Sequence, residues 1–367
     1  MVDRYIHKDV VFSVSVSDIK DTNLQLKTYA ALNDIFKGFI KSNDKTTAFS
    51  FKFTDHIDTF INEKEFVRAK DIRTGNNQTY FKDNELDYLI NHNEPFSLII
   101  NINNNESLKS SLRIFNKAFK NNIELQISIF YYRVFLIFSQ LWNIKNNCSY
   151  IHAASVEIDG GSILFSADSG VGKSALLFKL SEDKKARFIA DDLTIISNKS
   201  ESFYQGRCLS VKPYHLKFST HLSNKLEFLM AKIQKLQWRI LKDNRLTWRI
   251  APSDLFDDVC NKTEIKRVIH LCNHSKEDFI IKDISSKDLI QYALPILSNE
   301  FFLANHKLNT LASLPDSIFI SPQEMLSITK DIFRSAFNNK SLKLVSIPYR
   351  SSPNDLYKFL QKEGCLN

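Results

Sequence analysis

The chain has 367 residues, 43% of them hydrophobic and 12% aromatic, which is enough apolar material for two packed domains and excludes a disordered protein. Lys and Arg together number 49 and Asp and Glu 41, so the net charge is +8. This moderately basic balance suits phosphate groups or an acidic peptide. Because no dense basic run occurs, it does not predict nucleic-acid binding.

Cysteine usage and the N-terminal residues indicate the compartment. The five cysteines are scattered and odd in number, with no C-x-x-C pair, which argues against a disulfide framework or a zinc site and for a reducing compartment. The N-terminus has no apolar signal core. The most apolar long run, 125–144, is interrupted by Arg133 and Gln140 and predicts a buried helix, not a membrane span. We therefore expect a cytoplasmic protein with no membrane partner.

Residues 1–145 predict an α+β domain. Its expected strands are 10–16, 48–53 and 96–102, and its expected helices are 107–120 and 124–144. Ser17 and Asp18 are placed to cap the segment after the first strand. Such a domain is either a folded scaffold or a functional part of the protein that shapes a nucleotide cleft or binds a substrate.

Residues 152–196 carry the strongest signal, with four of the eight glycines in the chain. The apolar run 162–166 predicts a buried strand, 167–172 a loop, and the residues from Lys173 onward a helix. This order is typical of a phosphate-binding loop, in which backbone N–H groups and the helix N-terminus face phosphate oxygens. The predicted nucleotide-binding residues are Ser169, Gly170, Val171, Gly172, Lys173 and Ser174. Lys173 would reach the β- and γ-phosphates, and the Ser174 hydroxyl would bind Mg²⁺.

The loop departs from the motif at one position. The pattern G-x-x-x-x-G-K-[ST] asks for glycine where this chain has Ala167. Alanine tolerates a positive φ poorly, so either the first turn differs or this position is not left-handed. A glycine turn that merely precedes a helix is the alternative, and the strand upstream and the acidic pair downstream disfavour it.

Asp191 and Asp192 follow the apolar run 188–190 and precede another, 193–196. Carboxylates at a strand end beside a phosphate loop bind Mg²⁺ or take a proton from an attacking hydroxyl, and we favour this use over a solvated turn. His152 begins a predicted strand, 152–158, that the sheet can place beside the strand before the loop. Its imidazole is either a structural residue or a partner that orients the Asp191 carboxylate.

His152, the segment A-D-S-G-V-G-K-S at 167–174 and A-D-D at 190–192 together resemble the core of the HPr kinase/phosphorylase family. They resemble more closely its single-domain relatives, which are encoded beside peptide-modification enzymes. The resemblance implies a P-loop kinase fold, related also to phosphoenolpyruvate carboxykinase, that phosphorylates a serine hydroxyl with ATP and Mg²⁺. It implies that Lys173 and Ser174 bind phosphates and metal. It also implies that Asp191 is the general base, that Asp192 assists the metal and that His152 supports Asp191.

Two departures limit what the resemblance implies. Ala175 stands where the bifunctional enzyme has Glu after the loop serine, so one carboxylate near the metal is missing. The glycine-rich segment that carries the phosphorylase arginine has no copy, and the nearest stretch is 205–208, which includes Arg207. A kinase activity is compatible with both departures, whereas a phosphorylase activity and HPr as substrate do not follow.

Leucines and isoleucines at spacings of three and four predict one amphipathic helix within a basic insertion near 220–250; they are Leu222, Leu226, Leu229, Ile233, Leu236 and Ile240. This helix either docks an acidic peptide or is an ordinary surface helix with a solvated basic face. Arg207 and Lys212, which flank a short strand predicted at 209–213, likewise contact phosphate or peptide or are simply solvated. The other expected elements are strands at 264–272, 278–284 and 342–348 and helices at 287–296, from 322 onward and at 352–361.

The sequence therefore predicts an α/β protein with an α+β domain over 1–145 and a P-loop kinase domain of the HPr kinase type over 146–367. The expected activity is ATP- and Mg²⁺-dependent phosphorylation of a serine in a peptide or protein, with a ribosomally made peptide precursor as the first candidate. A kinase for a small molecule such as an amino acid and a non-catalytic nucleotide-binding switch are the alternatives. The resembling family contains hexamers, so a homo-oligomer stays open.

Overall fold

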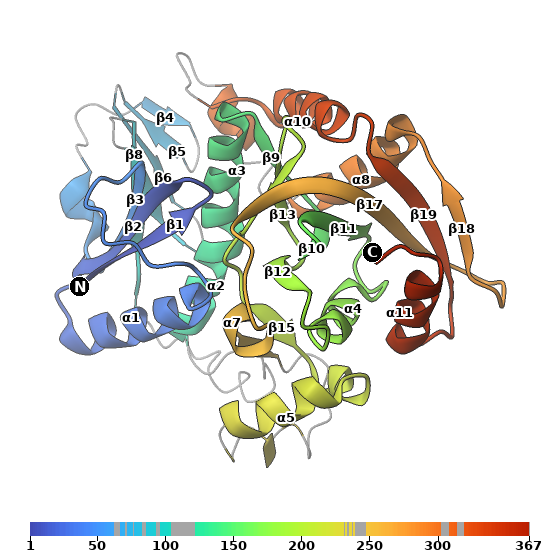
Figure 1. The fold of residues 1–367 in the computed structure, drawn as a ribbon. Helices are drawn as coiled ribbons and strands as arrows, with labels where there is room; N and C mark the ends of the chain where they lie inside the picture. Colours follow the sequence, from blue (N-terminus) through green and yellow to red (C-terminus); the bar gives the residue numbers. More distant parts are fainter. Residues whose placement is uncertain are drawn as a thin grey trace. The chain divides into compact units, whose positions relative to one another are not determined.

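Figure 1 shows the fold of the chain in a computed structural model. The residues it describes are 1–61, 67–69, 72–75, 77–82, 86–92, 96–103, 122–230, 232, 235, 236, 238, 247–301, 308–313 and 319–366. They form two compact units, Met1–Leu136 and Ile137–Asn367, each with its own sheet. Both units combine helices with mixed sheets, so the protein belongs to the α/β class.

The described part of the first unit is built on one eight-stranded sheet with the order β1-β2-β3-β8-β7-β6-β5-β4. The strands are β1 (Val2–His7), β2 (Val10–Asp18), β3 (Phe49–Thr54), β4 (Val67–Ala69), β5 (Ile72–Thr74), β6 (Gln78–Phe81), β7 (Tyr88–Asn91) and β8 (Phe96–Asn101). Neighbours β2, β3 and β8 run parallel, and the other neighbours are antiparallel. The three predicted strands are thus confirmed as β2, β3 and β8. The helix predicted at 107–120 lies outside the described residues.

Aromatic side chains fill the core of the first unit. Its helices are α1 (Thr22–Phe36), η1 (Ile57–Phe60), α2 (Asn122–Phe130) and the π-helical turn η4 (Tyr131–Phe135). The buried rings of Phe12 and Phe49 stack on neighbouring strands with centroids 5.4 Å apart, and Phe51 meets Phe130 of α2 edge to face at 5.1 Å. Such pairs stabilise a core beyond their buried area, so the high aromatic content of the sequence serves packing here.

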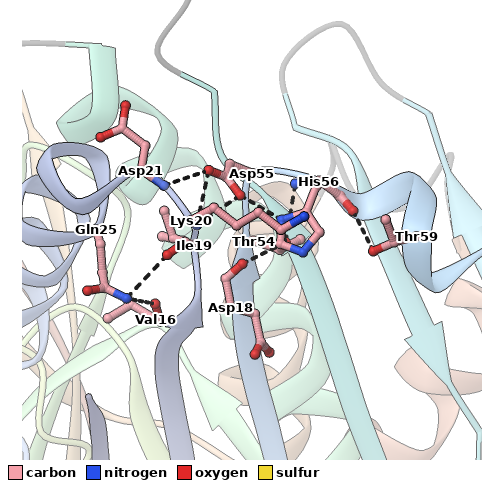
Figure 2. Close-up of polar contacts among 10 residues, drawn as sticks. All are labelled: Val16, Asp18, Ile19, Lys20, Asp21, Gln25, Thr54, Asp55, His56 and Thr59. Atoms are coloured by element: carbon pink, nitrogen blue, oxygen red, sulfur yellow. Dashed lines mark hydrogen bonds and ion pairs between the residues drawn. The ribbon is translucent and has the colours of Figure 1, made fainter.

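Asp55 anchors the connection between β2 and α1 to the end of β3 (Figure 2). Its carboxylate accepts the backbone N–H groups of Lys20 and Asp21, each at 3.1 Å, and lies 2.7 Å from Nδ1 of His56. Burial raises the pKa of Asp55, but the hydrogen bonds from His56 and the backbone outweigh burial and lower it to about 2. We call these four residues the Asp55 junction.

Asp21, and not Ser17 or Asp18, caps helix α1. Its Oδ1 accepts the N–H groups of Asn23 at 2.8 Å and Leu24 at 3.1 Å. The predicted cap was wrong because β2 continues through Asp18, which moves the first free position for a cap beyond the strand.

One helix in the described part of the chain, Asn122–Lys145, is long and apolar enough to cross a membrane by length and composition. Because 67% of its most apolar window is buried inside the protein, it has the character of a core helix, and a single such helix is weak evidence for a membrane span. The helix predicted at 124–144 is confirmed, with the π-helical turn η4 between α2 and α3 (Leu136–Lys145).

The second unit contains the candidate site. Its strands are β9 (Cys148–Ile151), β10 (Ala153–Ile158), β11 (Gly161–Ala167), β12 (Arg187–Ala190), β13 (Thr194–Ser197), β14 (Glu201–Phe203), β15 (Leu209–Val211), β16 (Trp248–Ile250), β17 (Lys262–His274), β18 (Ile280–Asp283) and β19 (Ser341–Pro348). Its other helices are α4 (Lys173–Leu180), η5 (Pro213–Lys217), α5 (Thr220–Leu229), α7 (Pro252–Leu255), α8 (Ser286–Glu300), α10 (Pro322–Ala336) and α11 (Pro353–Lys362). The strands and helices predicted after residue 260 are confirmed as β17, β18, β19, α8, α10 and α11.

The main sheet of this unit has the order β12-β10-β11-β17-β14-β13-β9, and β19 and β18 extend it from β17. Strands β11, β17 and β19 are parallel neighbours, so their carboxyl ends meet at one edge. At that edge β11 leads into α4 and β19 into α11, and these two helices pack against each other (Figure 1). The loops that begin them therefore lie at the same edge, where open α/β sheets bind ligands.

The single helix predicted from Leu222 to Ile240 is wrong. Helix α5 ends at Leu229, because the backbone of Met230 is extended. Only Leu222 and Leu226 of the predicted stripe are buried within α5, whereas Phe228 is 88% exposed. Most of residues 231–246 lie outside the described residues.

Candidate active site

The glycine loop, residues 168–172, joins β11 to α4 as predicted. Strand β11 runs through Ala167, which is fully buried and pairs with Leu271 of β17. Ala167 is therefore the last residue of the strand and not the first of the loop, so no glycine is needed there. The positive backbone angles fall instead on Gly170, with φ +85°, and Gly172, with φ +110°, where a side chain would be strained.

The loop offers a run of backbone donors. In the described part of the chain, the N–H groups of residues 170–174 donate no hydrogen bond, and no side chain caps the N-terminus of α4 at Gly172. The first N–H groups of a helix have no partner within it, and the helix dipole adds a partial positive charge there. This arrangement suits an anion such as a phosphate.

The side chain of Lys173 folds toward the start of the glycine loop. Its Nζ donates to the carbonyl oxygens of Ala167 at 2.9 Å and Asp168 at 3.0 Å, and its side chain is buried. Burial lowers the pKa of Lys173, and the neighbouring acidic groups, Asp192 first among them, offset part of that effect. Because an ammonium has three N–H groups, one remains for an acceptor beside the loop.

Asp191 follows β12 and lies against the start of α4. The Ser174 hydroxyl donates to its Oδ1 at 3.0 Å, which brings the end of the glycine loop and the acidic pair together as predicted. Asp191 is only 5% exposed. Burial, together with the charge of Asp192, raises its pKa to about 6.

Asp192 stands at the centre of a strained turn. The Leu193 N–H donates to the carbonyl of Asp191 at 2.9 Å, and the φ of Asp192 is +72°. A three-residue turn with a positive φ at its centre is rare, and this backbone conformation costs free energy in any residue but glycine. Such strain persists only where the surroundings hold it, and it is concentrated at functional sites.

The two carboxylates of the acidic pair contact different partners. Oδ1 of Asp192 lies 2.8 Å from Nε2 of His152, and Nη1 of Arg207 donates to its Oδ2 at 2.7 Å. Burial raises the pKa of Asp192, but the Arg207 guanidinium and the His152 imidazole outweigh burial and lower it. Asp192 therefore stays anionic near neutral pH, whereas Asp191, with its pKa of about 6, changes protonation state just below neutral pH.

The partner predicted for His152 was wrong. The buried imidazole contacts Asp192 and not Asp191, because the turn at Asp192 sends its carboxylate to the ring while Asp191 faces Ser174. His152 lies between β9 and β10, and β10 pairs with β11, so the predicted proximity of this segment to the loop strand is confirmed.

Two further residues belong to this cluster. Arg207, which the sequence left open between phosphate contact and simple solvation, is largely buried and pairs with Asp192. Glu300, at the end of α8, has Oε1 3.7 Å from Nε2 of His152 and was not predicted. The sequence had singled out Arg207 by its place in the stretch 205–208 and beside the predicted strand 209–213, whereas Glu300 had no sequence signal. Arg207 follows Gly206, whose φ is +82°.

Within the described residues, no group of three or more His, Cys, Asp or Glu side chains is placed to hold a metal ion. Mg²⁺ commonly takes one or two protein ligands and completes its shell with water and substrate phosphates. The Ser174 hydroxyl and one carboxylate of the acidic pair, beside donors for phosphate, fit that mode of binding. They do not fit a site built from protein ligands alone.

No protein-family model and no curated protein matches this sequence. Among solved structures, one match is the HPr(Ser) kinase/phosphatase from Coxiella burnetii, with 13% sequence identity and a TM-score of 0.28. The match covers 59% of this chain and 97% of that chain. At this TM-score the likeness is too weak to assign the chain to a family.

Proposed function

We propose that the second unit is a P-loop kinase that uses ATP and Mg²⁺ to phosphorylate a hydroxyl group, with a serine of a peptide or protein as the acceptor. The observation that carries this proposal is the 3.0 Å hydrogen bond from Ser174 to Asp191, which joins a loop suited to phosphate with a titratable acidic pair. A phosphate site alone would fit any nucleotide-binding protein. A carboxylate that titrates near neutrality beside it supplies a group for proton transfer.

The phosphates of ATP would be held by the glycine loop. In the described part of the chain, the N–H groups of residues 170–174, at the start of α4, donate no hydrogen bond and are free for phosphate oxygens, and Lys173 has one N–H group left for an oxygen. Such a phosphotransferase needs little covalent chemistry from the protein, because positioning and charge stabilisation account for most of the rate.

Ser174 and Asp192 would hold Mg²⁺. Arg207 and His152 keep the Asp192 carboxylate ionised over the neutral range, and each of its oxygens has a second lone pair beside the one that these partners use. When bound, Mg²⁺ neutralises charge on the β- and γ-phosphates.

Asp191 would act as the general base. Its carboxylate takes the proton of the acceptor hydroxyl while the hydroxyl oxygen forms a bond to the γ-phosphorus and the bond to the bridging oxygen of the leaving ADP breaks. A pKa raised to about 6 suits this role, because a base works best when its pKa lies near the operating pH. Paired carboxylates whose pKa values are pushed apart commonly divide acid–base and electrostatic roles in this way.

The test is intact-mass spectrometry of serine-containing peptides, acidic sequences included, and of a panel of small hydroxyl compounds after incubation with the protein, ATP and Mg²⁺. We expect one peptide to gain one phosphoryl group, and we expect this gain to be lost with Asp191→Asn. The matched control is Asp257→Asn, because Asp257 is an exposed carboxylate of the same unit.

The other outcomes separate the alternatives. A phosphorylated product in the small-molecule panel alone would keep the kinase and replace the acceptor by a free amino acid or similar compound. ATP binding or hydrolysis without any phosphorylated product would contradict a kinase and support a nucleotide-dependent switch.

A further inference from the structure

A second loop lies at the same sheet edge as the glycine loop. Residues 349–352 connect β19 to α11, just as residues 168–172 connect β11 to α4, and the two helices pack together. The N–H of Tyr349 donates to the carbonyl of His274, the last residue of β17, at 3.1 Å. The loop is therefore fixed to the strand that separates β11 from β19.

This loop exposes an aromatic ring to solvent. Tyr349 is 81% exposed, whereas Ile347 and Pro348 directly before it are buried. Arg350, the next residue, is also exposed. The start of α11 is already capped by Ser352 and Asp355, so the loop is not a second phosphate site but a surface with an aromatic face and a guanidinium.

The sheet order indicates which part of a nucleotide this surface would meet. The acidic pair follows β12, which lies on one side of β11 beyond β10, whereas β17 and β19 lie on the other side. If the γ-phosphate faces the acidic pair, the rest of the nucleotide points toward β19. Two strand spacings, about 10 Å, separate β11 from β19. Val345 is level with Ala167 at the end of β11, and Tyr349 lies four residues farther along, about 13 Å, in the direction in which the glycine loop also leaves its strand. An extended nucleoside triphosphate held at the glycine loop can reach across this separation.

We infer that Tyr349 and Arg350 form the nucleobase subsite of this protein, an inference that rests on the proposed function. The Tyr349 ring stacks on the base of a nucleoside triphosphate, and the Arg350 guanidinium contacts its ribose or α-phosphate. Every base has a face for stacking, so this subsite adds affinity with little discrimination between adenine and guanine.

The experiment is isothermal titration of the full chain with Mg²⁺·ATP and, separately, with Mg²⁺ and inorganic tripolyphosphate. The variants are Tyr349→Ala and Tyr349→Phe, with Phe228→Ala as a control that removes another exposed ring, on α5. We expect Tyr349→Ala to weaken ATP about 5- to 100-fold, the effect of losing one base–aromatic stack. Tripolyphosphate affinity should stay unchanged in every variant, and Tyr349→Phe should keep wild-type ATP affinity.

The two arms separate failure of this inference from failure of the proposed function. Unchanged ATP affinity in Tyr349→Ala, or an equal loss of ATP and tripolyphosphate, would overturn the nucleobase subsite while the phosphate loop stands. If the wild-type protein bound neither ligand, the proposed function itself would fail, and the subsite with it.

Discussion

Asp55 in the first unit and Asp191 in the second each directly follow the last residue of a strand, yet their carboxylates have opposite surroundings. The Asp55 carboxylate accepts two backbone N–H groups and contacts His56, and its pKa is lowered to about 2. Asp191 is buried with one hydroxyl partner, Ser174, beside the charge of Asp192, and its pKa is raised to about 6. Both residues are aspartates directly after a strand, so their neighbours cause the difference between their pKa values.

A carboxylate whose ionised form the backbone stabilises serves the fold. A carboxylate whose ionised form is disfavoured by burial and a like charge is ready to take a proton, and such groups are concentrated at functional sites. We therefore assign a structural role to the Asp55 junction, and we propose a chemical role for Asp191. Substitutions at these two positions should have opposite consequences for stability and activity.

The largest expected effect is on phosphoryl transfer. Asp191→Asn removes the proposed base and should lower the transfer rate by about 10²- to 10⁴-fold, whereas Asp55→Asn should leave the rate per folded molecule unchanged. Single-turnover rates with the acceptor found by mass spectrometry measure this, with the folded fraction taken from circular dichroism. An equal loss of rate in both variants would contradict the distinction between a structural Asp55 and a catalytic Asp191.

The next effect concerns the charge of Asp192. Arg207→Ala leaves this half-buried carboxylate without its largely buried guanidinium partner and should lower the free energy of unfolding by about 1–3 kcal/mol. Arg334→Ala, which removes an exposed ion pair with Asp331 on α10, should change it by less than about 0.5 kcal/mol. Urea denaturation of both variants tests the contrast, and similar losses would mean that the Asp192 pair is no stronger than a surface pair.

Asp55→Asn should lower the free energy of unfolding by about 1–3 kcal/mol at pH 7. Because the pKa of Asp55 is lower in the folded chain, its contribution is fully present above pH 3.8 and is lost as the pH falls toward 2. The difference between wild type and variant should therefore shrink through this window. Urea midpoints from pH 7 downward measure it, and a difference independent of pH would argue against the junction.

The smallest expected effect is a gain. The pKa of Asp191 is higher in the folded chain, so wild-type stability falls as the pH rises from 3.8 to about 6. Asp191→Asn avoids this loss and should be more stable than wild type at pH 7, by no more than the roughly 3 kcal/mol that the full pKa difference represents, with no gain below pH 3.8. Thermal or urea denaturation at pH 7 checks the sign, and a destabilised variant would mean that burial of this carboxylate is fully compensated.

The sequence predicted what depends on residues close together in the chain. The order of strand, glycine loop and helix at 161–180 and the acidic pair after β12 are local patterns, and the structure has both. Even Ala167, a departure from the motif, is compatible with the site because it lies in the strand and not in the turn.

Contacts between distant segments could not be predicted in the same way. The partner of His152 depends on the positive φ of Asp192, which no pattern in the sequence marks. Glu300 reaches the cluster only because α8 ends beside His152. The helix after residue 220 was overestimated because periodic leucines do not by themselves secure burial, and Phe228 lies exposed near its end.

The most direct test of the central claim is the affinity of Mg²⁺·ATP for the wild-type chain, Lys173→Ala and Lys179→Ala, measured by isothermal titration. Lys179 is the matched control, because it lies on the same helix but pairs with Glu182. We predict that the wild type binds ATP, that Lys173→Ala weakens binding at least about tenfold, the loss of roughly one charge-assisted hydrogen bond, and that Lys179→Ala does not. Equal affinities in all three proteins, or no binding by the wild type, would contradict a phosphate site at the glycine loop.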